Sequence, residues 1–172
     1  MDSCAEQTYR AIESATRGIT AAELAWHPEG KWNAAQVLEH LSLTYTGTTK
    51  MARRLAAGEH PPKLPRTWKN RLFTFVTVTI GYLPSGRKSP EMVVPGQGTD
   101  PETLLKNLAA MDEALSECER RHGPNVAAEH PILGPLTIPQ WRKFHCVHAN
   151  HHMKQVTALR QHVGAQSKSA AV

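Results

Sequence analysis

Residues 32–58, WNAAQVLEHLSLTYTGTTKMARRLAAG, contain the signals of a complete helix. Asn33 stands at the N-cap position with Gln36 three residues later, which is the pattern of a capping box. Trp32 and Val37 occupy the two positions of a hydrophobic staple. Apolar positions then recur at helical spacing, so we expect a long helix with one face directed into a core. That face carries Val37, Leu41, Thr44, Met51 and Leu55.

Hydrophobic periodicity predicts further helices on either side of this one. The later helices have start signals of their own, because Pro101 falls in the first turn of one and Thr137 precedes Gln140 by three residues in the other. The predicted helices cover residues 2–17, 67–83, 99–123 and 137–163.

The segment 67–83 is the ambiguous one. Its run of β-branched and aromatic residues from Phe73 to Ile80 favours a strand. Leu72, Val76 and Ile80 nevertheless form a helical stripe, and no partner strand is predicted elsewhere in the chain. We therefore expect a helix here.

Together these segments predict an all-α fold, a four-helix bundle with one extra short helix. The connection 58–99 is long, which favours a crossover between the second and third bundle helices and an up-down-down-up order. We expect a single domain over residues 1–163 and a flexible C-terminal tail over 164–172.

Composition narrows the classes of function. No apolar run approaches the roughly 20 residues that cross a bilayer. We therefore expect no membrane partner. The net charge of +5 is distributed in short basic pairs without interleaved aromatic residues, so a nucleic-acid partner is not expected either. Three widely spaced cysteines are typical of reduced thiols in a cytoplasmic protein. They are Cys4, Cys118 and Cys146.

Ten histidines are many for this length, and several cluster in the last predicted helix. His148 and His152 are four residues apart and so project from one helical face, a spacing that lets two imidazoles bind one metal ion. His40, on the inward edge of 32–58, is the candidate third ligand. Hydrogen-bonded core histidines are the alternative interpretation. Further residues on or beside this face could line a pocket or hydrogen-bond to the ligands: His145, His151, Thr44, Trp141 and Gln155.

Two stretches resemble motifs of the DinB/YfiT-like superfamily. Residues 30–41, GKWNAAQVLEHL, look like its second-helix motif, and residues 130–155 are similar to its last-helix motif. Members are four-helix bundles that bind a divalent metal, commonly nickel or zinc, through one histidine on the second helix and a His-x-x-x-His pair on the last. The resemblance thus implies a metal bound by His40, His148 and His152.

The resemblance also implies a class of function. Related families include transferases that use a low-molecular-weight thiol, and others assigned as hydrolases. We therefore expect a metal-dependent enzyme that acts on a small-molecule substrate, with a general base that the sequence does not identify. The alternative is a non-enzymatic helical bundle with a structural metal, acting as a homodimer.

Overall fold

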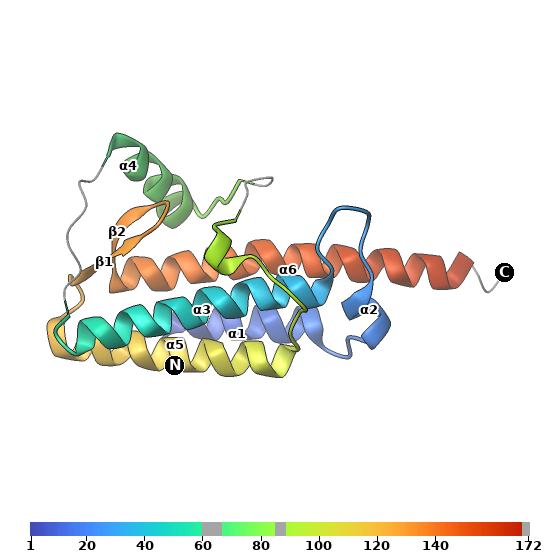
Figure 1. Ribbon diagram of the computed structural model, residues 1–172, viewed down its shortest axis with the longest axis horizontal. Helices are drawn as coiled ribbons and strands as arrows, with labels where there is room; N and C mark the ends of the chain where they lie inside the picture. The colour runs from blue at the N-terminus through green and yellow to red at the C-terminus, as the bar shows by residue number, and fades with distance from the viewer. Residues whose placement is uncertain (60–66, 85–88, 170–172) are drawn as a thin grey trace.

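The computed structural model describes residues 1–59, 67–84 and 89–169, and it is mainly helical with one small two-stranded sheet (Figure 1). Within these residues, no helix is both long enough and apolar enough to cross a bilayer. In chain order the elements are α1 (Ser3–Thr16), α2 (Ala21–Ala25), α3 (Ala34–Ala56), α4 (Trp68–Thr74), the π-helix η1 (Phe75–Ile80), the 3₁₀-helix η2 (Glu91–Val93), α5 (Pro101–His122), β1 (Ala127–His130), β2 (Gly134–Thr137) and α6 (Ile138–Ser169).

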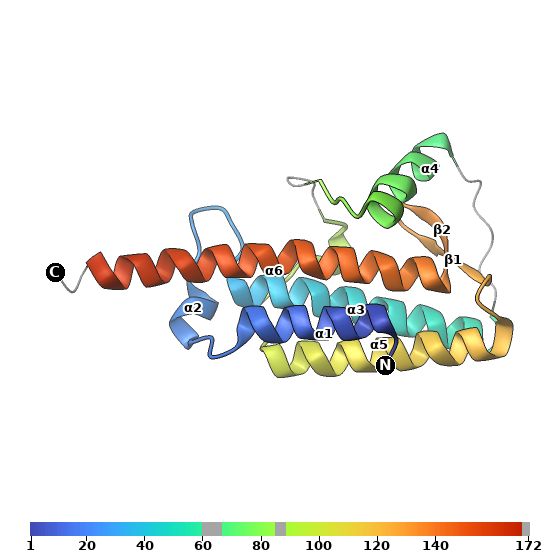
Figure 2. The same cartoon turned by 180° about the vertical axis from the view of Figure 1, so that it is seen from behind.

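Helices α1, α3, α5 and α6 lie side by side along the long axis of the molecule, as Figures 1 and 2 both show. The helices α3 and α5 run in the same direction, and α1 and α6 run the opposite way. The chain between α3 and α5 passes over α6, where it forms α4, η1 and η2. Leucines from several helices fill the core between them and are fully buried: Leu38, Leu41, Leu104, Leu108 and Leu115.

The local signals around α3 act as the sequence indicates. The side chain of Asn33 accepts a hydrogen bond from the Gln36 N–H (2.8 Å), and the Gln36 side chain accepts one from the Asn33 N–H (3.1 Å). This closed capping box satisfies two backbone donors that a helix end leaves unpaired. It therefore fixes where α3 begins, and with that the rotation of every residue along it.

The segment 67–83 is helical, as predicted, but it is irregular. Thr67 and Asn70 form a capping box at the start of α4. The chain then widens into η1, which ends at Gly81 in the left-handed conformation (φ 79°). The β-branched residues of 76–80 fill this π-helix and do not form a strand.

Other boundaries differ from the prediction. Helix α5 begins at Pro101, two residues after the start of the predicted range 99–123, because the Asp100 carboxylate caps it by accepting from the Thr103 N–H (2.8 Å). Helix α6 continues through Gly164 to Ser169, since one glycine costs a helix only about 1 kcal/mol. The predicted tail thus begins as helix, and residues 170–172 lie outside the described part of the chain.

Four elements were not predicted at all, namely α2, η2, β1 and β2. Helix α2 is a single short turn capped by Thr20 and Glu23. The antiparallel hairpin of β1 and β2 pairs Ala127 with Thr137, and Gly134 permits its turn with φ of 75°. Strands of four residues with a proline in one of them leave too little alternation to recognise in a sequence.

A short segment of the crossover, residues 93–98, is fastened to the first turns of α3. Both the Gly96 and the Gly98 N–H donate to the Glu39 carboxylate, at 2.8 and 2.7 Å. The next residue, Thr99, donates its N–H to the Ala35 carbonyl (3.0 Å). Gly98 has φ of 94°, and a Cβ there would lie 2.6 Å from the Ala35 Cβ. Backbone contact at this position therefore requires glycine.

Substitution of Gly98 by alanine should destabilise the protein by about 2 kcal/mol or more, because the new Cβ meets α3 and the backbone conformation is strained. Gly47→Ala is the matched control: this exposed glycine lies inside α3, and a Cβ there has nothing within 4 Å. It should stabilise by about 0.5–1 kcal/mol. Urea denaturation measures both. Equal effects of the two substitutions would contradict the packing of residues 93–98 on α3.

Candidate metal centre

Three histidine nitrogens from two helices converge at the centre of the molecule. His40 comes from α3, and His148 and His152 come from successive turns of α6. The Nε2 atom of His148 lies 3.2 Å from Nε2 of His40 and 3.0 Å from Nε2 of His152. All three side chains are buried, with between 4 and 7% of their surface exposed. The structure therefore brings together the three residues that the sequence singled out.

Hydrogen bonds donated by the far ring nitrogens orient two of these imidazoles. His40 donates from Nδ1 to the Val93 carbonyl (2.8 Å), and His152 donates from Nδ1 to Oε1 of Gln155 (2.8 Å). A neutral imidazole that carries its proton on Nδ1 has its lone pair on Nε2. Both rings thus direct a lone pair at the point where the three nitrogens meet.

Protons alone do not account for these contacts. His148 has one Nε2, which can donate to only one of its two neighbours, so at least one short contact joins two lone pairs without a hydrogen between them. A cation bound by all three lone pairs removes this repulsion. Ligands about 2.05 Å from an ion, at angles of about 95–110°, are separated by about 3.0–3.4 Å. The two separations that His148 makes, 3.0 and 3.2 Å, lie within this range.

Burial keeps these rings in the form that a metal requires. Desolvation lowers the pKa of His152 to about 3, lowers the pKa of His148 well below its ordinary value, and also lowers the pKa of His40. The bond to the Val93 carbonyl partly opposes the shift at His40. Neutral imidazoles are the ligands that divalent ions of the later transition series bind.

Aromatic side chains hold the ligand rings from outside. The Phe144 ring stacks on His148, with 5.2 Å between ring centroids and 21° between planes. The Trp32 ring lies against His40, with 5.3 Å between ring centroids.

Among the described residues no carboxylate or thiol joins the three histidines in a group that could hold a metal. A bound ion would therefore keep coordination positions that no carboxylate, thiol or further imidazole of the described residues fills.

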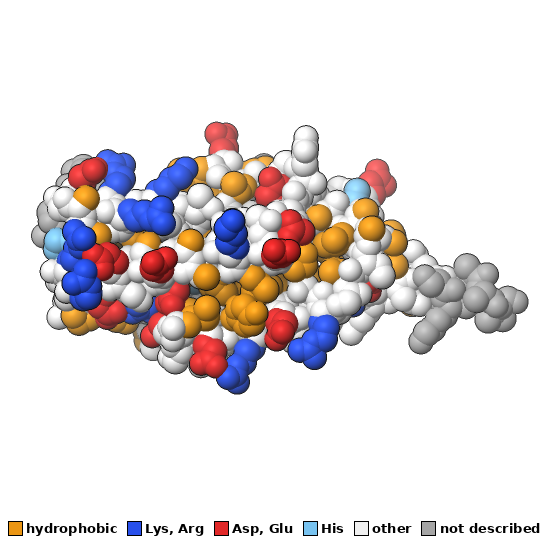
Figure 3. Space-filling view, turned by 90° about the horizontal axis from the view of Figure 1, so that it is seen from below, with side chains coloured by type: hydrophobic (Ala, Val, Ile, Leu, Met, Phe, Trp, Pro, Cys, Tyr) orange, Lys and Arg blue, Asp and Glu red, His pale blue; other side chains and the backbone are white. Residues whose placement is uncertain are grey.

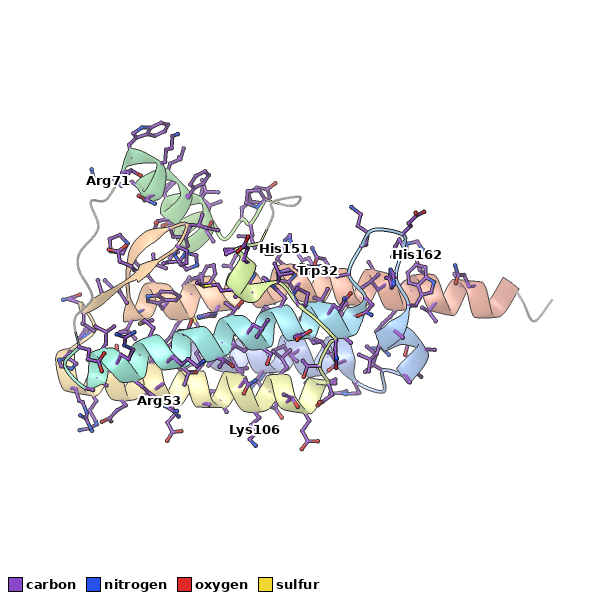
Figure 4. All side chains as sticks on the ribbon, in the orientation of Figure 1. Trp32, Arg53, Arg71, Lys106, His151 and His162 are labelled. Carbon is purple, nitrogen blue, oxygen red and sulfur yellow. The ribbon has the colours of Figure 1, made fainter. Side chains whose placement is uncertain are left out.

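The open side of the centre faces a cavity of about 1230 Å³. It lies between α3, α6, the crossover and the β1–β2 hairpin, and Figure 4 labels Trp32 and His151 on this side. Its walls are largely apolar, with a few hydroxyl and amide groups among them. The larger apolar side chains include Trp32, Met51, Phe73, Leu83, Trp141 and Leu159.

The remaining predicted residues divide between the cavity and the core. Thr44, His151, Trp141 and Gln155 line the cavity. Gln155 links two histidines, since its Oε1 accepts from His152 while its Nε2 donates to Nε2 of His151 (3.1 Å). His145 does not line the cavity; it is fully buried and shares a hydrogen bond with the Thr48 hydroxyl (3.0 Å).

Several contributors were not foreseen from the sequence. The Glu39 carboxylate anchors the crossover that carries Val93, and through it positions His40. Val93 contributes a backbone carbonyl, which no side-chain pattern reveals. Phe144 could have been found, because it precedes His148 by four residues and so shares its helical face.

Comparison with known proteins places the chain in a family without assigning it an activity. A family model described as "Protein of unknown function (DUF1569)" matches residues 1–159. No curated protein and no solved structure matches the chain.

We expect the protein to hold about one divalent ion per chain. His40→Ala, His148→Ala or His152→Ala should each weaken binding by more than about 100-fold, and Gln155→Leu by about 10-fold, because it frees the His152 ring. The measurement is competition with a chromophoric chelator. His130→Ala and His151→Ala are the controls and should change affinity much less. If His151→Ala weakened metal binding as much as His152→Ala, the proposed ligands would lie on the wrong face of α6.

Chelator-treated protein should lose stability as the pH falls from about 6.5 towards 4. Burial lowers the pKa of His145 to about 3, whereas in the unfolded chain this group has its ordinary pKa of 6.5. The unfolded state therefore binds more protons in this window. As the pH is lowered, the free energy of unfolding decreases by about 1.4 kcal/mol per pH unit for each such histidine. His145→Gln should remove about one histidine's share of the slope. Urea denaturation at several pH values tests this, and an unchanged slope in the variant would refute it.

Proposed function

We propose that this chain, which belongs to the DUF1569 family, is a divalent-metal-binding protein, most simply a metal-dependent enzyme that acts on small molecules. The observation that carries the proposal is the convergence of three buried, neutral imidazole nitrogens beside a large apolar cavity. Nickel or zinc suits a centre made of imidazole nitrogen alone.

We further propose that the fold is the up-down-down-up four-helix bundle of the DinB/YfiT-like superfamily. The parallel course of α3 and α5 supports this, since they are joined by the crossover that carries α4, η1 and η2 (Figure 1). The ligands also come from the elements that the resemblance implies, one from α3 and two from α6.

In this proposal the chain's own residues bind and orient. His40, His148 and His152 hold the ion, and the Val93 carbonyl and Gln155 fix two of the rings. A bound divalent ion would lower the pKa of a coordinated thiol or water and so supply a nucleophile at neutral pH. Phe144 and Trp32 exclude water from the flanks of the ligand rings.

The cavity supports a small, partly apolar substrate. Its walls carry more apolar than polar groups, and Thr44 and Gln155 are among the hydrogen-bonding side chains near the centre. Two exposed lysines, Lys31 and Lys50, line the cavity at its border. Among the described residues that line it, Glu129 is the single acidic one. This charge balance favours a neutral or anionic substrate, such as a low-molecular-weight thiol carrying carboxylates.

We also propose a cytoplasmic location, which free thiols at Cys4, Cys118 and Cys146 suit.

If a thiol is the co-substrate, adding glutathione-like thiols to cobalt-substituted protein should produce a new sulfur-to-metal charge-transfer band and permit turnover of an electrophile. If water is the nucleophile, thiols should leave the spectrum unchanged, and model esters or amides should be cleaved at a rate that rises with pH as the bound water ionises.

The control for both assays is His148→Ala, which should lose the spectrum and the turnover together. The alternative is a helical bundle with a structural metal that acts as a homodimer. It would be supported if thiols and small anions such as azide left the metal spectrum unchanged and no model ester or amide was cleaved.

A further inference from the structure

An apolar stripe runs along the outer side of α4 and into η1. Trp68, Leu72 and Phe75 follow one another at helical spacing and so lie along one side. Their side chains are 70, 50 and 53% exposed. Ile80 and Tyr82, just beyond, are exposed to a similar degree. Surface aromatic and aliphatic residues that gather on one short segment in this way indicate a contact site.

The inner side of the same segment is unusually polar. Its buried side chains are Thr74 and Thr77, with Phe73 and Val78 partly buried beside them. The Thr74 hydroxyl donates to the Leu133 carbonyl (2.9 Å), and the Asn70 amide donates to the Ile132 carbonyl (3.0 Å). Hydrogen bonds to the hairpin turn thus help to hold α4 in place, while Trp68, Leu72 and Phe75 remain exposed on its other side. A surface helix usually directs most of its large apolar side chains inward.

Positive charge accompanies the stripe. At about 100° per residue, Lys69 and Arg71 flank it on opposite sides. Residues 60–90 of the sequence contain six basic residues and no acidic one, whereas the rest of the chain contains fourteen basic and fifteen acidic residues. The whole net charge of +5 therefore originates in this part of the sequence. By contrast, acidic and basic side chains are interspersed on the face that Figure 3 shows.

We propose that the outer face of α4 and η1, consisting of Trp68, Lys69, Arg71, Leu72 and Phe75, docks on the surface of an anionic lipid bilayer. The apolar stripe would enter the boundary between headgroups and acyl chains, and the two flanking cations would meet lipid phosphates and carboxylates. This partner departs from the expectation drawn from the sequence, which considered segments that span a bilayer. A surface helix needs only one exposed face.

Charge argues against a second copy of the chain as the occupant. A two-fold symmetric contact through this face would set Lys69 and Arg71 against the same residues of the other copy, and no acidic residue within 67–84 could pair with them. A nucleic acid is a poorer match as well, because the centre of the face is aliphatic and aromatic while the cations lie at its edges. An anionic lipid surface offers apolar contact to the stripe and negative charge to the two flanking cations.

Flotation of the full chain with vesicles tests the proposal. Vesicles of equimolar phosphatidylcholine and phosphatidylglycerol should bind the protein, and vesicles of phosphatidylcholine alone should bind it at least about tenfold more weakly. Trp68 is the most exposed large hydrophobic residue on α4 and η1, so its fluorescence should shift to the blue on binding and be quenched by brominated acyl chains. Trp68→Phe should keep most of the binding and lose most of that signal.

Charge reversal provides a matched pair of variants. Lys69→Glu with Arg71→Glu should weaken vesicle binding by more than about tenfold. Arg53→Glu with Lys106→Glu makes the same change in net charge on the other side of the molecule, as Figure 4 shows, and should reduce binding far less. Leu72→Glu should abolish binding. Far-ultraviolet circular dichroism should be unchanged in all of these variants, because the residues are exposed.

Three outcomes would overturn the proposal: no binding to anionic vesicles, equal loss from the two charge-reversed pairs, or a dimer in analytical ultracentrifugation that Leu72→Glu dissociates without any vesicle binding by the original chain. None of these measurements depends on the metal. Failure here would therefore leave the proposed metal-dependent activity untouched, and His148→Ala should bind vesicles like the original chain.

Discussion

Three neutral imidazoles with lone pairs directed at one point inside a protein form an arrangement that the surrounding chain must enforce. Each buried ring loses the hydrogen bonds of water, and at least one of the two Nε2 contacts, at 3.0 and 3.2 Å, is repulsive unless a cation lies between the nitrogens. Hydrogen bonds from the outer nitrogens of His40 and His152 then determine which ring nitrogen is free. Much of the architecture serves this constraint. The capping box sets the rotation of α3, and Glu39 holds the crossover whose Val93 carbonyl reaches His40.

The sequence was informative wherever the interacting residues lie close together along the chain. Asn33 and Gln36 announce the start of α3 because both partners of the capping box are within one turn. His148 and His152 announce a shared face because helical geometry relates them directly. The choice of His40 as third ligand came from its place on the inward edge of its helix, and family resemblance strengthened it.

What could not be predicted depends on contacts between distant segments. Glu39 bonds to the N–H groups of Gly96 and Gly98, nearly sixty positions later, and an isolated glutamate on a helix gives no sign of such partners. The β1–β2 hairpin is similarly hard to predict, because Trp141 bonds to its strand β1 and Asn70 on α4 bonds to its turn, both from outside the hairpin itself. Phe144 was overlooked although its spacing from His148 was visible, since aromatic residues on a helix more often indicate core packing.

The placement of two candidate ligands, His148 and His152, on one uninterrupted helix has a consequence for how this family can vary in length. A single-residue insertion or deletion between His148 and His152 would rotate one imidazole by about 100° and remove it from the centre. The same change between Asn33 and His40 would shift the third ligand relative to its cap. The distance of 108 positions between His40 and His148 carries no such restriction, because the connecting chain leaves and rejoins the helices. Natural changes in chain length should therefore concentrate in the connections, while the spans 33–40 and 148–152 keep a fixed number of residues.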